Sequence, residues 1–314
     1  MWNVIKKIFS SKIFLGLISI ILIYFAFKKV DAKIIISELS RVSIWFVVFN
    51  LIYQFLILFL IAYRWTILVF EKPKFIDAWN FVRAIYVGMF YSLFFPSSGT
   101  AIDMVKWVPL IKRYPDLSKQ KLLGTLVLDR MLTLTAFYLM AFVSLIGAKL
   151  AGFNFPNYLF LIISLIFLVF VLFFVFLLNG KLDILFNKIP YLKNIKEVDS
   201  LLKDRKKIIK CIGIGLITEI LWLLPIWFIS NMFGAGFSLM SIYVFVPLIT
   251  TILILPISFS GFGAREQLYL YFFGQLGLNN EKILLVSTFF GIIGIVSCLL
   301  GGIFMFAYGE KEQK

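Results

Sequence analysis

The sequence predicts an all-α, polytopic integral membrane protein, and three observations predict this class. Of the 314 residues, 61% are hydrophobic and 15% are charged, and the mean hydropathy is +0.99, which excludes an ordinary soluble globular protein. Uncharged runs at residues 150–180, 220–264 and 283–309 each exceed the roughly 20 residues that span a hydrocarbon core. No alternating strand pattern accompanies these runs, so the backbone groups that lipid cannot satisfy must be hydrogen-bonded within helices.

The first apolar run covers residues 13–27 and follows three lysines, as the core of a signal peptide would. No cleavage site of the A-x-A type comes after it, so we predict a retained first helix. The next segment, residues 28–41, is basic but carries isoleucines and Leu39 on part of one face. This pattern predicts an amphipathic helix at the membrane interface.

The remaining apolar segments predict further helices, some long enough to cross the membrane and some too short. In chain order we expect them at residues 42–63, 78–95, 100–110, 122–147, 158–178, 211–230, 239–255, 262–275 and 282–308.

Two helix breaks of the same kind occur, one in each half of the chain. In each, a proline and small hydroxyl residues interrupt an apolar run, and an acid and a base follow within a turn or two, at residues 94–106 and 255–266. The segments after Gly99 and Gly261 are too short and too charged to cross, so each should form a re-entrant hairpin with the helix before it. Paired broken helices at matching positions point to a transporter's binding site.

The two hairpins predict an inverted repeat within a single membrane domain, residues 1–314. Pro96 precedes Lys121 by 25 positions, and Pro256 precedes Glu281 by 25. Three full crossings lie between the hairpins, and because three is odd, the second hairpin must enter from the opposite face. The expected units are residues 78–148 and 239–308, in a bundle of about six full crossings.

Basic residues predict the orientation. Residues 181–210 hold nine Lys or Arg against four acids, so we place this stretch in the cytoplasm. Both termini then lie in the cytoplasm of a multi-pass protein of the cell membrane, either inner or plasma. The formal net charge of +15 is explained by the same bias, and we expect no nucleic-acid partner.

Ionisable residues deep in apolar runs are the candidate functional residues, because a charge there costs at least ~2.5–3.5 kcal/mol on insertion scales. Four acids and four bases balance, which fits an internally paired cluster. A role limited to inter-helix salt bridges stays open, above all for the Asp129 and Arg130 neighbours and for Glu219. The eight residues are Arg83, Asp103, Lys106, Asp129, Arg130, Glu219, Arg265 and Glu266.

Short helices that begin after the breaks would aim unsatisfied N–H groups and positive dipole ends at the membrane centre. Such termini attract anions, phosphate above all. The serines and glycines could instead only permit the turns. The residues predicted to bind substrate are Ser97, Ser98, Gly99, Thr100, Asp103, Lys106, Asp129, Arg130, Glu219, Ser258, Ser260, Gly261, Gly263, Arg265 and Glu266.

Other side chains narrow the chemistry. Histidine is absent, and Cys211 and Cys298 both lie in apolar segments, so we expect no catalytic triad, no metal and no cofactor. Aromatic residues near predicted helix ends, Trp65 among them, are expected to be interfacial anchors. Glycines of the last helix are expected at close-packing positions, and they are Gly291, Gly294, Gly301 and Gly302.

The chain resembles the transmembrane-domain family of lysylphosphatidylglycerol synthases, also called flippase-like. The resemblance is carried by P-x-x-G from Pro96 with Asp103 and Lys106, by Asp129-Arg130, and by P-x-S-x-x-G-x-G-x-R-E from Pro256. It implies a domain that moves aminoacylated phosphatidylglycerol across the bilayer, with polyprenyl-linked lipids as a further substrate class. Lys106 stands where the family's arginine is expected, and the family's soluble synthase domain is not expected here.

The leading hypothesis is therefore a lipid translocase that binds membrane lipids through phosphate-bearing head groups. An intramembrane transferase using one of the buried acids is the enzyme alternative, and no nucleotide or metal motif accompanies it. A non-catalytic scaffold that recruits a cytoplasmic lipid-modifying enzyme, such as a lipid aminoacyl- or glycosyl-transferase, is the third reading. Which lipid moves, and in which direction, the residues leave open.

Overall fold

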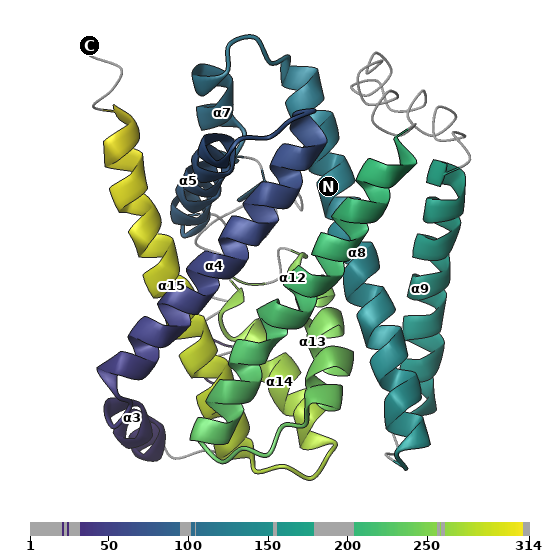
Figure 1. Cartoon of the computed structure of the whole chain (residues 1–314). Helices are drawn as coiled ribbons and strands as arrows, with labels where there is room; N and C mark the ends of the chain where they lie inside the picture. The colour runs from purple at the N-terminus through teal and green to yellow at the C-terminus, as the bar shows by residue number, and fades with distance from the viewer. Residues whose placement is uncertain are drawn as a thin grey trace, which may run out of the picture. The chain divides into compact units, whose positions relative to one another are not determined.

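A computed structural model describes residues 21, 24, 32–94, 102, 103, 105–152, 156–178, 204–255, 258 and 261–309. Every regular element in this part of the chain is a helix (Figure 1), as the composition predicts for a polytopic membrane protein. In chain order the helices are α3 (Ala32–Ser40), α4 (Ile44–Val69), α5 (Phe75–Ser92), α7 (Val108–Arg113), α8 (Lys119–Leu150), α9 (Asn157–Leu178), α12 (Arg205–Met232), α13 (Leu239–Leu253), α14 (Ala264–Gly274) and α15 (Asn280–Gly309).

Four helices of the described part are long and apolar enough to cross a membrane, namely α4, α8, α12 and α15. Two apolar helices are shorter where their residues are described, Asn157–Phe173 of α9 and Leu239–Leu253 of α13. At 1.5 Å per residue, α14 with 11 residues falls well short of a crossing. The described part therefore contains both long and short helices, as the apolar runs predict.

Most expected helices form within a few residues of their predicted bounds, and four outcomes differ. Helix α4 continues to Val69 rather than ending at residue 63, and α12 begins at Arg205 rather than at residue 211. In the expected segment 100–110, Ile102 and Asp103 are helical and α7 begins only at Val108. The first helix, residues 13–27, lies outside the described residues except for Ile21 and Tyr24, which are both helical.

The chain divides into two compact units, and one of them consists of Leu56–Ala84 and Trp107–Trp222. In this unit, which we call unit 2, α8 and α9 pack side by side (Figure 1). A core cluster joins Ile67 and Leu68 of α4 to Leu128 and Leu132 of α8 and to Ile208 and Cys211 of α12. Helix α8 begins where the Ser118 hydroxyl accepts a hydrogen bond from the Lys121 N–H at 3.1 Å, an N-cap.

Trp65 belongs to this core, so the prediction of an interfacial anchor at this position is wrong. Its side chain is buried, its ring lies 4.7 Å from the Phe81 ring, and its Nε1–H donates to Thr125 Oγ1 at 3.2 Å. The prediction failed because helix α4 continues past Trp65 for four more residues. A partner for the indole N–H is what a buried tryptophan requires.

The other unit, unit 1, comprises Met1–Phe55, Ile85–Lys106 and Leu223–Lys314. Here α14 packs on both α13 and α15, and α3 packs on α15. Leu39 contacts the cluster of Leu284 and Leu285, so the expected helix before residue 41 forms and packs on α15 through this side chain. The Phe237 and Phe273 rings stack at 3.9 Å.

Close packing at Gly301 and Gly302 is confirmed. A Cβ at Gly301 would lie 2.0 Å from the Tyr86 carbonyl oxygen, and one at Gly302 would lie 3.1 Å from the Phe90 ring. Only glycine at position 301 lets the α15 backbone approach α5 this closely.

Candidate functional site

The second helix break, in unit 1, is built on glycine. Gly261 and Gly263 have φ values of +80° and +76°, which belong to the left-handed region that favours glycine over residues with a Cβ. Gly263 is the N-cap residue of α14. Ser258 is buried just before this turn, and Ser260 lies outside the described residues. The G-x-G of the sequence is therefore a backbone requirement of the turn that starts α14.

Glu266 closes the N-terminus of α14 from within. Its Oε2 accepts a hydrogen bond from the Gly263 N–H at 2.7 Å, and its Oε1 accepts bonds from Arg265 Nη2 at 2.8 Å and Nε at 3.2 Å. The Ser287 hydroxyl of α15 donates a longer bond of 3.4 Å to the same Oε1. A carboxylate at this place is stabilised by the helix dipole. The helix N-terminus thus already holds an anion, which belongs to the protein.

Arg265 is seated against α15 at a glycine. A Cβ on Gly291 would lie 1.9 Å from Arg265 Nη2, so the guanidinium could not keep this position beside a larger residue, whereas a Cβ on Gly294 would meet nothing within 4 Å. The Phe262 ring lies 5.3 Å from the Arg265 guanidinium carbon, a cation–π distance. Gly291 was expected at a position of close helix packing, but what it admits is a guanidinium.

One edge of this guanidinium is left over. Arg265 Nε and Nη2 both face Glu266, while Nη1 makes no hydrogen bond to any residue that the structure describes. The side chain is 13% exposed. Glu266 of the same helix therefore uses only part of the hydrogen-bonding capacity of this guanidinium. A planar fork of N–H donors remains for an oxygen-bearing ligand.

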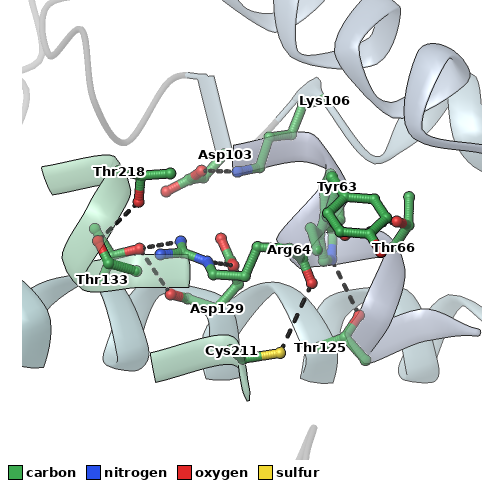
Figure 2. Close-up of polar contacts among 12 residues, drawn as sticks. Tyr63, Arg64, Thr66, Asp103, Lys106, Thr125, Asp129, Thr133, Cys211 and Thr218 are labelled. Atoms are coloured by element: carbon green, nitrogen blue, oxygen red, sulfur yellow. Dashed lines mark hydrogen bonds and ion pairs between the residues drawn. The ribbon is translucent and has the colours of Figure 1, made fainter. Parts of the chain in front are cut away.

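The first break is described only after the turn. Lys106 Nζ and Asp103 Oδ1 form an ion pair at 2.8 Å (Figure 2), and the lysine is buried. A Cβ on Gly88 of α5 would lie 2.8 Å from the Ile102 carbonyl oxygen and 3.1 Å from Lys106 Cβ, so a glycine admits this segment too. The predicted residues Ser97, Ser98, Gly99 and Thr100 lie outside the described residues.

A third buried ion pair, in unit 2, centres on Arg64. Arg64 Nε donates to Asp129 Oδ1 at 2.8 Å, and Nη2 donates to Thr133 Oγ1 (Figure 2). The Arg64 and Asp129 side chains are 1% and 3% exposed. Arg64 Nη1 lies 3.1 Å from the position of a Cβ on Gly215 of α12 and has no hydrogen-bond partner in the described part of the chain.

Sequence reasoning missed Arg64 because it ended the second helix at residue 63, before this arginine. The available signal was the apolar run that continues through residues 67–70. Asp129 was predicted and is brought to Arg64. Glu219 is buried on α12 and interacts electrostatically with Arg64, Arg130 and Asp129.

Arg83 and Arg130 are half-buried, in α5 and α8 of unit 2. Among the described residues, no group of three His, Cys, Asp or Glu side chains gathers as a metal would require. Five of the described candidate residues belong to ion pairs, namely Asp103, Lys106, Asp129, Arg265 and Glu266.

These features define the chain as an all-helical, multi-pass membrane protein that buries arginine–carboxylate and lysine–carboxylate pairs beside breaks and glycines. The family model described as the lysylphosphatidylglycerol synthase TM region matches residues 13–302. The chain belongs to this family, and the resemblance carried by its two breaks is confirmed. Searches of curated proteins and of solved structures find no match to the chain.

Proposed function

We propose that the chain is a lipid translocase that moves a phosphate-bearing lipid between the leaflets of the cell membrane. The observation that carries the proposal is Arg265, a half-buried cation in unit 1 with one edge held by Glu266 and the other without a hydrogen bond to the described residues. An ionisable side chain within an apolar region and beside a helix break is a candidate for a substrate path.

The chemistry of Arg265 selects the head group. A guanidinium offers parallel N–H donors that match the oxygens of a phosphate, and it stays charged in apolar surroundings. Glu266 orients the Arg265 guanidinium by accepting hydrogen bonds from Nε and Nη2. It also provides a counter-ion for the arginine when no lipid is bound. Acyl or prenyl chains would remain in the bilayer while the phosphate visits this site. An aminoacylated phospholipid and a polyprenyl-linked lipid both satisfy this description.

The proposal includes a topology. Six full crossings, formed by the first apolar run and by α4, α8, α9, α12 and α15, would accompany two re-entrant hairpins, with both termini in the cytoplasm. The short lengths of α13 and α14, 15 and 11 residues, support a hairpin at the second break. A cysteine introduced among residues 181–210 would react with an impermeant thiol reagent only from the cytoplasmic side.

The test replaces Arg265 by alanine in the reconstituted protein. Vesicles carrying a fluorescent phosphatidylglycerol in both leaflets are treated with an impermeant reductant, so the bleached fraction reports lipid movement. We expect Arg265→Ala to abolish movement, because the phosphate loses its desolvated cation. Arg113→Ala, at an exposed position of α7, is the matched control and should move lipid at the wild-type rate.

The arginine change also leaves Glu266 without its partner, so folding is checked by thermal unfolding in detergent. Arg265→Lys keeps the charge and should retain part of the activity. Lipid movement by folded Arg265→Ala at the wild-type rate would refute the phosphate site. In a separate experiment, mass spectrometry of lipid that co-purifies with the wild-type protein would identify the class of lipid that it binds.

A further inference from the structure

Glu219 is a buried acid with no assigned partner near the middle of a membrane-crossing helix. It lies in α12, its side chain is 6% exposed, and it makes no hydrogen bond or salt bridge within the part of the chain that the structure describes. A carboxylate held in this way is costly as an anion, because desolvation is not offset by hydrogen bonds. An acid at such a position in an apolar helix is a candidate for a side chain that changes its charge.

The charged groups around Glu219 come from two other helices of unit 2. Arg64 of α4 and both Asp129 and Arg130 of α8 interact with it electrostatically. Arg64 directs Nε to Asp129 and Nη2 to Thr133, so its strongest bonds are already made. The carboxylate of Glu219 is therefore attracted by nearby positive charges but is not held by a salt bridge within the described part of the chain.

A donor without an acceptor faces the same helix. Arg64 Nη1, which lacks a hydrogen-bond partner among the described residues, lies against Gly215, one turn before Glu219 on α12. Side chains on a helix tilt toward its N-terminus, so the Glu219 side chain extends toward the turn that contains Gly215. A small movement of the carboxylate toward Nη1 would satisfy both groups when Glu219 is ionised.

The ligand that this arrangement can accept is a proton. A metal cation requires several oxygen ligands, and no group of three potential ligands occurs in the described chain. A proton requires one oxygen lone pair. Binding forms an O–H bond on the carboxylate, removes the buried negative charge and involves no other reactant.

We propose that Glu219 is a proton-binding site, which is ionised while it accepts a hydrogen bond from Arg64 Nη1 and neutral when it leaves that donor. Its use to drive lipid movement rests on the translocase function proposed above. Binding of the proton itself does not rest on that function, so the two can be tested apart. Asp129 keeps its ion pair with Arg64, at 2.8 Å, outside this exchange.

Infrared difference spectroscopy tests proton binding directly. Purified protein in lipid nanodiscs is shifted between mildly acidic and alkaline buffers, and the absorption of a protonated carboxyl group in an apolar site is followed. We expect a titrating band in the wild type that is missing in Glu219→Gln and present in Glu71→Gln, which changes an exposed acid. A band that survives in Glu219→Gln would overturn the proposal, whereas its loss only there would establish it.

Transport with a pH gradient tests the use of the site. Vesicles hold a pH-sensitive dye, and lipid movement is measured with and without the gradient. We expect the gradient to accelerate lipid movement in the wild type, and to leave the rate of Glu219→Gln unchanged from the rate that this variant has without a gradient. Gradient-independent movement in both proteins would refute coupling while leaving the translocase intact. Absence of movement in the wild type would refute the translocase, and the infrared titration would still decide proton binding.

Discussion

Arg64 in unit 2 and Arg265 in unit 1 are both buried against a glycine of a neighbouring helix, but their carboxylate partners differ in origin. Asp129, the partner of Arg64, lies 65 residues away on another helix, whereas Glu266 is the next residue after Arg265. The Arg64 pair ties α4 to α8. The Arg265 pair ties a helix only to itself, so it holds a cation in place without fixing the distance between helices.

We propose that the Arg64 pair is structural and that the Arg265 pair takes part in binding. Breaking the Arg64 pair would remove an ion pair that joins α4 to α8 and whose two side chains are both buried. If Arg265 turned away from Glu266, the carboxylate would keep its bond from the Gly263 N–H at 2.7 Å. We propose that this second bond lets Arg265 exchange its partner for a ligand that comes and goes.

The largest effect on stability should follow from Arg64→Ala, which leaves Asp129 buried and unpaired. We expect a loss of about 3–5 kcal/mol of unfolding free energy, as for other broken buried pairs. Thermal unfolding in detergent is the measurement. The double change Arg64→Met with Asp129→Leu removes both charges and should recover most of the loss, so equal instability of the single and double variants would contradict a pairwise role.

A smaller, functional effect is expected from Gly291→Ala. A methyl group there would lie 1.9 Å from Arg265 Nη2, so the guanidinium must leave its seat, and overpacking costs about 1–3 kcal/mol. Lipid movement should fall toward the Arg265→Ala level. The matched control is Gly294→Ala in the same helix, where a Cβ meets nothing within 4 Å. If both variants moved lipid equally well, the seat at Gly291 would have no bearing on function.

Gly215→Ala should have a weaker effect than Gly291→Ala, which sharpens the comparison between the two arginines. Its Cβ would lie 3.1 Å from Arg64 Nη1, the far end of a flexible side chain. The higher helix propensity of alanine, worth about 0.5–1 kcal/mol over glycine, offsets part of this crowding. We expect unfolding temperatures close to wild type in detergent. A destabilisation as large as that of Arg64→Ala would mean that Arg64 cannot adjust.

The sequence alone predicts the helices well because apolar length decides them. It predicts Asp129, Arg265 and Glu266 as candidate functional residues because charged side chains stand out in apolar runs. It did not predict Arg64 as a buried residue, because the predicted helix ended before it, nor that Gly291 makes room for a guanidinium. Both depend on which side chain of a distant segment packs opposite, and apolar periodicity carries no information about that. Pairing between the two breaks stays a prediction, since residues 95–101 lie outside the described chain.

The smallest effect is expected from Lys106→Arg, at the first break. Lys106 is buried, pairs with Asp103 at 2.8 Å, and has its Cβ 3.1 Å from the position of a Cβ on Gly88. Arginine keeps the charge, and its fork can bind the Asp103 carboxylate through two bonds instead of one. Lipid movement in vesicles should therefore equal or exceed that of the wild type. Lys106→Met, which strands Asp103, should lower both stability and transport. If lipid movement by Lys106→Arg fell as far as that by Lys106→Met, the compact ammonium itself would be required at this position. The first break would then need a lysine where the second break has an arginine.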